Sequence, residues 1–172
     1  LHKAIRRQRQ MCIRDRYSEY QLLILIFVKR IVPMDTRFSV AVHALILIAE
    51  SDVPLTSEQI AASAGVNPSY IRKVLTLLRN TGIISAHRGI RGFALNTDKE
   101  SLSLLQIYRA VSDGNLSLFD IHQNPNDRCI VGRHIKPVLS NIFRDLENEL
   151  SLKMQEKTLK DCINEIIKRE KI

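Results

Sequence analysis

The stretch that most constrains the fold of this chain runs from Leu55 to Arg91 and reads LTSEQIAASAGVNPSYIRKVLTLLRNTGIISAHRGIR. Two short helical patterns lie on either side of a Gly-Val-Asn-Pro break, and a hairpin punctuated by glycine follows them. This order is typical of a helix-turn-helix followed by a wing. The sequence therefore predicts a mostly α-helical fold with a small β-hairpin wing, and double-stranded DNA is the first partner to expect.

Capping residues mark the ends of the two predicted helices. Thr56 or Ser57 is the expected N-cap of the first helix, which ends at Gly65. Asn67 caps the second helix, and Pro68 stands at its first position, where the missing N–H costs nothing. Helical spacing predicts a buried side on each helix, made of Ile60, Ala61 and Ala64 on the first and of Ile71, Val74, Leu75 and Leu78 on the second.

The other face of the second helix suits the major groove of DNA. It carries hydroxyl, phenol and cationic side chains, where Arg can pair bidentately with guanine. Arg88, beside Gly89 at the wing tip, suits a narrow minor groove or a phosphate contact. Ordinary solvated surface is the competing interpretation of that helix face. The predicted DNA-binding residues are Thr56, Asn67, Ser69, Tyr70, Arg72, Lys73, Arg79, Arg88 and Arg91.

The distribution of charge favours DNA over solvent. No Asp or Glu occurs from Gln59 to Thr97, whereas five Lys or Arg residues fall in that stretch. A solvated face normally mixes both signs, so a stretch of one sign on this pattern favours phosphate contact. The alternative is a winged-helix module for protein interaction that lacks specific DNA recognition.

Several spaced segments resemble the Rrf-type family of bacterial winged-helix regulators, which includes iron-sulfur and nitric-oxide sensors. The segments are TRFSVAVHALILIA, LTSEQIAASAGVNPSYIRKVLTLLRNTGII and RGIRGFAL, between Asp35 and Leu95. CIVGRHI and the Thr-Leu of EKTLKDCI resemble the sensing loop and the C-terminal region of the family. Arg91 departs from the pattern, since the family usually has glycine there. The resemblance implies a transcriptional regulator.

The first 33 residues look foreign to this domain. Arg6 to Arg16, RRQRQMCIRDR, resembles the in-frame translation of a common sequencing adapter, and Met34 begins the part that resembles the family. We expect residues 1–33 to be an adapter and upstream translation outside the fold. Residues 34–172 then form one regulator, with a DNA-binding part at 34–98 and a sensing loop and dimerisation helices at 99–172.

A signal peptide is the competing interpretation of the N-terminal segment. Its apolar run, Leu22 to Val28, is only seven residues long, and no small-residue cleavage site follows it. Residues 1–33 also hold eight Lys or Arg against two acids, a net charge of +6 within the +8 of the whole chain. The remaining 139 residues therefore have a net charge of +2. Only the local basic stretch argues for DNA.

A helix is expected from about Thr36 to Ala49, with Asp35 or Thr36 as its cap. His43 on this helix is expected to be a hydrogen-bonded histidine of the core or its boundary, because no second metal ligand stands at helical spacing. The expected buried residues are Phe38, Val42, Leu45, Ile46 and Ile48.

A further helix is predicted near Ser101 to Val111, and a loop from Asp120 to Arg133 follows it. The resemblance implies that cluster-holding relatives use three cysteines in this loop. This chain has only Cys129 there, so no iron-sulfur cofactor is expected. His122 and His134 lie seven and five residues from Cys129, spacings that match no zinc pattern well.

Cys129 is instead a candidate thiol sensor. Arg128 and Arg133 flank it, and nearby cations lower the pKa of a thiol and raise its reactive thiolate fraction. Ile130 and Val131 could alternatively bury the sulfur as a small, inert apolar group. Both interpretations remain open at the level of sequence.

From Pro137 the chain predicts a long amphipathic helix whose apolar stripe suits a partner helix in a second copy of the chain. Packing onto its own domain is the alternative. The predicted dimerisation residues are Leu139, Ile142, Phe143, Leu146 and Leu150, with Val138 and Met154 on the same stripe. Thr158 and Asp161 are expected to cap a last helix that holds Leu159, Ile163, Ile166 and Ile167.

No enzyme motif is present, because the sequence has neither a glycine-rich phosphate loop nor a Gly-x-Ser-x-Gly elbow. Apart from Cys12, only Cys129 and Cys162 occur, which is no disulfide framework. We therefore expect a cytoplasmic, homodimeric winged helix-turn-helix repressor that binds a pseudo-palindromic operator. No membrane partner is expected, and no residue pattern names an inducer.

Overall fold

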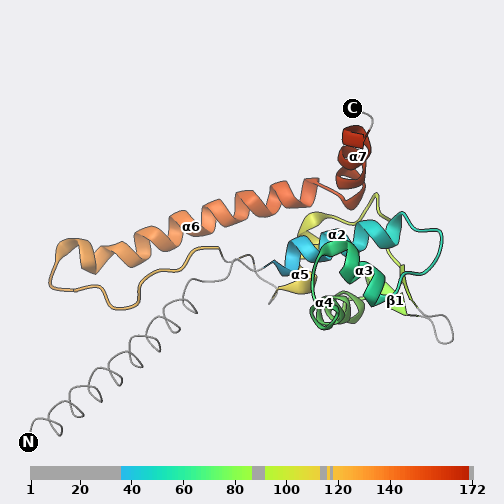
Figure 1. Cartoon of the computed structure of the whole chain (residues 1–172). Helices are drawn as coiled ribbons and strands as arrows, with labels where there is room; N and C mark the ends of the chain where they lie inside the picture. Colours follow the sequence, from blue (N-terminus) through green and yellow to red (C-terminus); the bar gives the residue numbers. More distant parts are fainter. Residues whose placement is uncertain (1–35, 87–91, 113–115, 117, 171–172) are drawn as a thin grey trace, which may run out of the picture. The chain divides into compact units, whose positions relative to one another are not determined.

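The computed structural model describes residues 36–86, 92–112, 116 and 118–170. The predicted adapter segment, residues 1–33, lies outside them. Arg37–Ile172 is one compact unit, and its mostly helical fold with a two-stranded wing confirms the predicted fold class (Figure 1). Its elements are α2 (Arg37–Ala49), α3 (Ser57–Ala64), α4 (Pro68–Asn80), β1 (Ile84–Ala86), β2 (Phe93–Leu95), α5 (Leu104–Val111), α6 (Ile130–Glu156) and α7 (Leu159–Glu170).

The helix-turn-helix consists of α3 and α4, and its caps are those expected from the sequence. Thr56, not Ser57, caps α3: its hydroxyl accepts from the Gln59 N–H at 3.3 Å, and Gln59 Oε1 accepts from the Thr56 N–H at 2.9 Å. Gly65 ends α3 with a φ of 63°, a left-handed conformation that favours glycine. The Asn67 side chain caps α4 by accepting from the Ser69 N–H at 2.8 Å.

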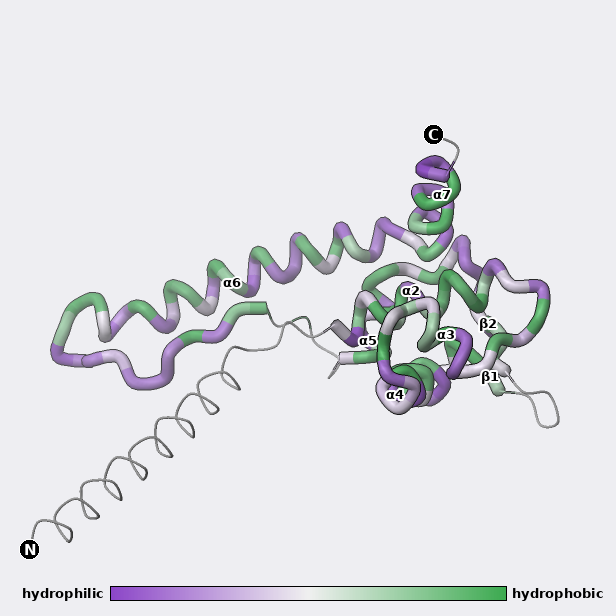
Figure 2. The backbone as a smooth tube through the Cα atoms, viewed as in Figure 1, coloured by the Kyte–Doolittle hydropathy of each residue, from purple (hydrophilic) through white to green (hydrophobic). Residues whose placement is uncertain are grey.

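One core joins α2, α3, α4, β1, α5 and α7. The four predicted apolar residues of α4 are all buried, and Ile60 and Ala61 of α3 are buried with them. Ala64 is only half-buried, so its predicted burial is wrong. Figure 2 shows apolar and polar residues alternating along these helices.

The buried side of α2 differs from the predicted one. Leu45 and Ile48 are buried as expected, but Phe38, Val42 and Ile46 only border the core. The side is centred instead on small residues, because α2 packs against α3, α4, α5, α7 and β2 at once. Small side chains allow that many elements to approach closely. The residues that replace the predicted ones are Val40, Ala41 and Ala44.

The wing is an antiparallel pair in which Ile84 lies opposite Leu95 and Ala86 lies opposite Phe93. β1 begins at Ile84, and Ile83 directly before it is also buried. Directly before β2, a Cβ atom on Gly92 would lie 2.6 Å from the carbonyl carbon of Pro54. The wing therefore rests directly on the loop that precedes α3.

α5 begins at Leu104, three residues later than predicted. The preceding Leu102 is buried in an extended segment, since its carbonyl accepts from the Leu159 N–H at 2.9 Å. The Leu104 N–H donates in turn to the Lys157 carbonyl at 2.8 Å. These two bonds attach the junction of α6 and α7 to the start of α5.

α6 begins at Ile130, so the prediction of a loop to Arg133 and a helix from Pro137 is wrong. Pro137 lies inside the helix. Proline has no backbone N–H to donate and is normally disfavoured in the interior of a helix. Here the helix has already formed before it, because the Arg133 N–H donates to the Cys129 carbonyl at 3.0 Å and Arg133 Nε donates to the Asp127 carbonyl at 3.2 Å.

No residue of α6 is buried, and α5 is the element against which this helix mainly packs. Further contacts attach the chain before α6 to the middle of the helix: the rings of Phe119 and Phe143 lie 4.8 Å apart, and Glu147 accepts from the Leu118 N–H at 2.7 Å. Within the described residues, no helix combines the length and apolar content that a membrane span requires.

Candidate nucleic-acid interface

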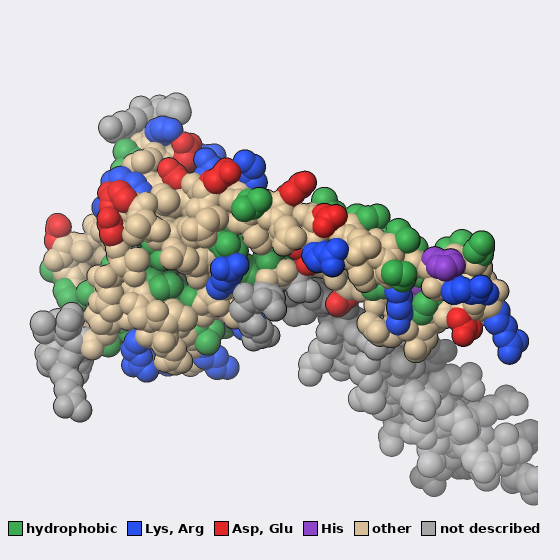
Figure 3. Space-filling model, turned by 180° about the vertical axis from the view of Figure 1, so that it is seen from behind, with side chains coloured by type: hydrophobic (Ala, Val, Ile, Leu, Met, Phe, Trp, Pro, Cys, Tyr) green, Lys and Arg blue, Asp and Glu red, His purple; other side chains and the backbone are tan. Residues whose placement is uncertain are grey.

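The outer face of α4 carries the predicted recognition residues. Ser69, Arg72, Lys73, Thr76 and Arg79 are exposed. Tyr70 is half-buried because its ring also borders the core. Basic side chains project from the edge of the molecule that α4 forms (Figure 3). The helix therefore presents cations and hydroxyls on one side while its apolar side holds it to the domain.

Two acceptors on two different helices hold the guanidinium of Arg72. Glu58 Oε1 on α3 accepts from Arg72 Nη1 at 3.0 Å, and the Ser69 hydroxyl on α4 accepts from Arg72 Nη2 at 3.2 Å. The Thr76 hydroxyl donates to the Arg72 carbonyl at 2.7 Å. Arg72 is thus the cation of this face whose direction is fixed by its neighbours.

Glu58 is a residue of this face that is absent from the predicted set. Its pKa lies below the usual value because the backbone N–H at Glu58 and the Ser57 hydroxyl stabilise the carboxylate, with a further contribution from Arg72. The carboxylate is therefore charged at neutral pH. The signal that could have identified it is its position as the last acid before the basic stretch that starts at Gln59.

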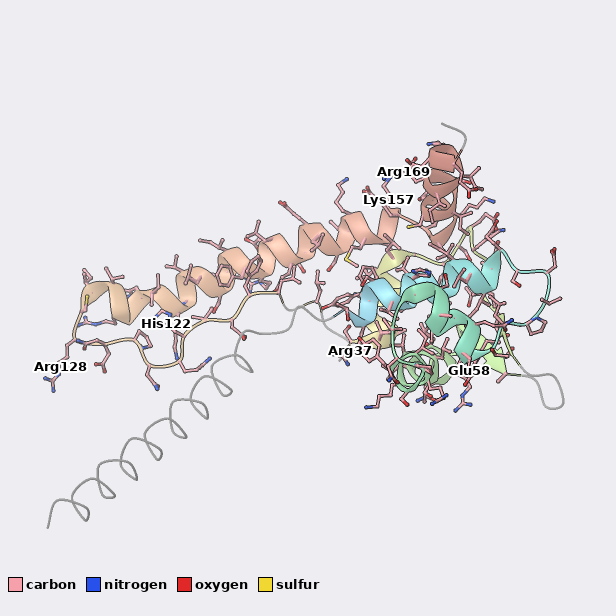
Figure 4. All side chains as sticks on the ribbon, in the orientation of Figure 1. Arg37, Glu58, His122, Arg128, Lys157 and Arg169 are labelled. Atoms are coloured by element: carbon pink, nitrogen blue, oxygen red, sulfur yellow. The ribbon has the colours of Figure 1, made fainter. Side chains whose placement is uncertain are left out.

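Arg37, also absent from the predicted set, lies beside α4. It lines a surface groove of about 490 Å³ together with Tyr70, Arg72, Lys73 and Thr76. Arg37 and Glu58 flank α4 on opposite sides in Figure 4. Helical spacing within one segment could not reveal this neighbour, because only the packing of α2 on α4 brings Arg37 to the groove.

The remaining predicted DNA-binding residues fall into three groups. Thr56 and Asn67 use their side-chain oxygens to cap α3 and α4, so they fix the helix starts. Arg79 lies exposed in the last turn of α4. Arg88 and Arg91 lie outside the described residues, which resume after the wing tip at Gly92.

Cys129 lies at the N-cap of α6 and is exposed. The pKa of its thiol is lowered by the backbone N–H groups of Gly132 and Val131, not by the arginines on which the sequence argument relied. Ile130 and Val131 are 74% and 62% exposed, so within a single chain they do not bury the sulfur. The interpretation in which these two residues bury the sulfur is therefore wrong for the single chain.

The described residues do not supply the donors that an iron site needs. Cys162 lies on α7, beyond the other end of α6, whose 27 residues span roughly 40 Å. Cys129 and Cys162 of one chain therefore cannot share a metal ion. Among the described residues, no group of three or more His, Cys, Asp or Glu side chains is placed to bind a metal.

His43 does not lie in the core. It is exposed on α2, where its Nε2 lies 3.1 Å from the Ser63 hydroxyl on α3. The expected hydrogen bond is present, but the expected position in the core or at its boundary is wrong, because the side chain is exposed.

The predicted dimerisation stripe of α6 lies largely open to solvent. Ile142, Leu146 and Leu150 are 48%, 46% and 38% exposed, while Leu139 and Phe143 are half-buried. Apolar residues recur along the whole helix in Figure 2. In its own chain α6 is contacted by α5 and by the segment of Leu118 and Phe119, and these contacts leave Ile142, Leu146 and Leu150 open to solvent.

Comparisons with known proteins agree with this arrangement. The profile of the Rrf2 family, described as "Iron-dependent Transcriptional regulator", matches residues 34–165. The chain is 35% identical over 133 residues to "Putative HTH-type transcriptional regulator YwnA" of Bacillus subtilis (strain 168), an alignment that covers 77% of this chain and 98% of YwnA.

Solved structures share the fold. One, described as "a putative DNA binding protein", is 32% identical with a TM-score of 0.59, covering 74% of this chain and 98% of that one. Another, described as "a putative transcriptional regulator" from Lactobacillus plantarum, has a TM-score of 0.66 at 23% identity and covers 77% of this chain and 91% of that one. The second likeness is evidence for the fold alone.

Proposed function

This chain belongs to the Rrf2 family of transcriptional regulators, and from that premise we propose that it binds double-stranded DNA as a homodimer and represses transcription by occupying a pseudo-palindromic operator. The family placement confirms the resemblance inferred from the sequence. Members of the family are transcriptional regulators and not enzymes. A role in regulating transcription disfavours the alternative of a protein-interaction module that lacks specific DNA recognition.

The observation that carries the proposal is the outer face of α4. Arg72, Lys73 and Arg79 are exposed there, on the second helix of a helix-turn-helix, which enters the major groove in this class of protein. We assign base reading to Arg72, Ser69 and Tyr70, and phosphate contact to Arg79 and Lys73. Arg37 joins the phosphate contacts because it lines the same groove.

A second copy of the chain is the proposed cover of α6. The exposed stripe around Ile142, Leu146 and Leu150 is too apolar for a surface that stays in water. A two-fold dimer would also place two recognition helices about 34 Å apart, one turn of DNA. Residues 34–98 then form the DNA-binding part, and residues 99–172 carry the sensing loop and the dimerisation helices. The proposed site of action is the cytoplasm.

Cys129 is proposed as the sensor of the regulator. It is exposed, its pKa is lowered, and it stands at the start of the helix assigned to the dimer. Oxidation there would add a bulky or charged group at the end of α6 and alter how the two copies pack. Because the donor set does not fit an iron-sulfur cluster, the signal is assigned to the thiol alone.

Binding to DNA selected from a random pool tests the proposal. Wild-type protein should enrich a two-fold symmetric sequence and should sediment as a dimer, alone and on DNA. Equal affinity for the enriched and random duplexes would refute specific recognition. For the sensor, mild peroxide should weaken operator binding by the wild type and leave Cys129→Ser unaffected; an equal response of both proteins would place the signal elsewhere.

A further inference from the structure

The ion pair between α3 and α4 is the basis of one further inference, which rests on the proposed function. We propose that Glu58 is a positioning residue that sets base discrimination by fixing the guanidinium of Arg72. Glu58 itself need not touch DNA for this role. It acts by limiting the directions in which Arg72 can present its remaining donors.

The partners of Arg72 are themselves fixed. Glu58 lies in the first turn of α3, which the reciprocal bonds of Thr56 and Gln59 hold in place. The Ser57 hydroxyl donates to Glu58 Oε2 at 3.1 Å, so one carboxylate oxygen is occupied by Ser57 and the other by Arg72. The second acceptor, Ser69, is anchored at the start of α4 because its N–H donates to Asn67.

The donors of Arg72 are only partly used by these contacts. A guanidinium has five N–H donors in a planar fork. Glu58 and Ser69 accept one bond from Nη1 and one from Nη2. Three N–H groups remain, which is enough for the bidentate pair with O6 and N7 of guanine. An arginine held in one orientation also loses less rotamer entropy on binding than a free one.

Stability does not account for the pair. The side chains of Arg72 and Glu58 are 52% and 64% exposed, and ion pairs so accessible to solvent add little to folding. A carboxylate next to a DNA-binding helix also repels phosphate, so it lowers general affinity. Among the described residues, Glu58 is the only acid that pairs with a cation of α4. This repulsion acts on every duplex alike, so Glu58 raises discrimination only through the base-reading cation that it orients.

The test compares Glu58→Ala and Glu58→Gln with the wild type, each alone and combined with Arg72→Ala. The probes are the duplex that the wild type enriches from a random pool, its single-base-pair variants and a random duplex. Glu58→Ala should lower the ratio of specific to random affinity roughly three- to ten-fold, through a gain on random DNA and a loss on the enriched site. Glu58→Gln should keep more of the ratio than Glu58→Ala, because its amide oxygen still accepts from Arg72.

The matched control is Glu165→Ala, which breaks a pair with Lys168 on α7 whose side chains are 61% and 69% exposed. It should leave the ratio unchanged. In the Arg72→Ala background, Glu58→Ala should change discrimination by less than about two-fold, because the residue through which it acts is gone.

Two results would overturn the inference while the proposed function stands. One is that Glu58→Ala keeps the wild-type ratio of specific to random affinity. The other is that Glu58→Ala lowers this ratio equally in the wild-type and the Arg72→Ala backgrounds. A wild-type chain that enriches no sequence would refute specific recognition itself, and the inference with it.

Discussion

The Ser103 hydroxyl joins two helices. It accepts from the Gln106 N–H at 3.2 Å, which caps α5, and it lies 3.2 Å from Gln155 Oε1, to which it donates near the end of α6. Ser103 is 1% exposed and is the polar residue buried among the described side chains. One small side chain therefore links the core to the helix that we assign to the dimer.

Ser103→Ala should lower the free energy of unfolding by about 1 kcal/mol, the usual cost of a lost N-cap. It should also speed amide hydrogen exchange in the last turns of α6, because the bond to Gln155 is lost. Thr56→Ala is the control, since it removes the equivalent cap of α3 without a contact to α6. If both variants affect exchange in α6 alike, Ser103 does not couple the two helices.

Arg72 and Arg79 should behave differently on DNA. Arg72→Ala should cost about 1 to 3 kcal/mol on the specific site and relax preference at one base pair in each half-site. Arg79→Ala should weaken specific and random duplexes alike and reduce the salt dependence of binding. Titrations of both variants at two salt concentrations check this. A uniform loss for Arg72→Ala would mean that the reading face was assigned wrongly.

The two thiols should react with iodoacetamide at different pH. The pKa of Cys129 lies below its ordinary value of 9.0 because backbone N–H groups stabilise the thiolate. Burial raises the pKa of Cys162 above that value. In a Cys12→Ser background, Cys162→Ser should therefore leave a thiol that is alkylated at lower pH than the one left by Cys129→Ser. Identical pH profiles would contradict this order.

Asp161 should make the thermal stability of the protein depend on pH. Its pKa is lowered below 3.8, first by the Thr158 backbone N–H, which it accepts at 2.9 Å. A lowered pKa in the folded state stabilises the protein above the ordinary pKa, and this contribution is lost as the pH falls through the folded value. Asp161→Asn should therefore lower the Tm at pH 7 and have a smaller effect near pH 3. Thr158→Ala removes the uncharged hydroxyl that accepts from the Asp161 N–H, so this variant should lower the Tm at both pH 7 and pH 3.

Removal of residues 1–33 should leave the regulator intact. A chain that begins at Met34 should match the full chain in Tm and in specific DNA affinity, because the segment that resembles the family starts there. Thermal melts and titrations of both chains test this. A loss of more than about 1 kcal/mol in stability would show that the segment contributes to the fold.

The sequence by itself determined the helix-turn-helix. Caps and helical spacing are local properties, so Thr56, Gly65 and Asn67 marked the helix ends and the buried side of α4 was predicted completely. The start of α6 was harder to predict. Pro137 suggested that a helix begins there, but α6 begins at Ile130, because bonds from Arg133 to the preceding loop hold the earlier turns in place.

Tertiary structure decided which distant residues meet. Helical periodicity favoured the large apolar side chains of α2, but Ala41 and Ala44 are buried as well, because five elements pack against that side of the helix. The same packing brings Arg37 to the groove beside α4 and sets Glu58 against Arg72. No spacing rule links residues on separate helices, since their distance depends on how the helices pack and not on how far apart they stand in the chain.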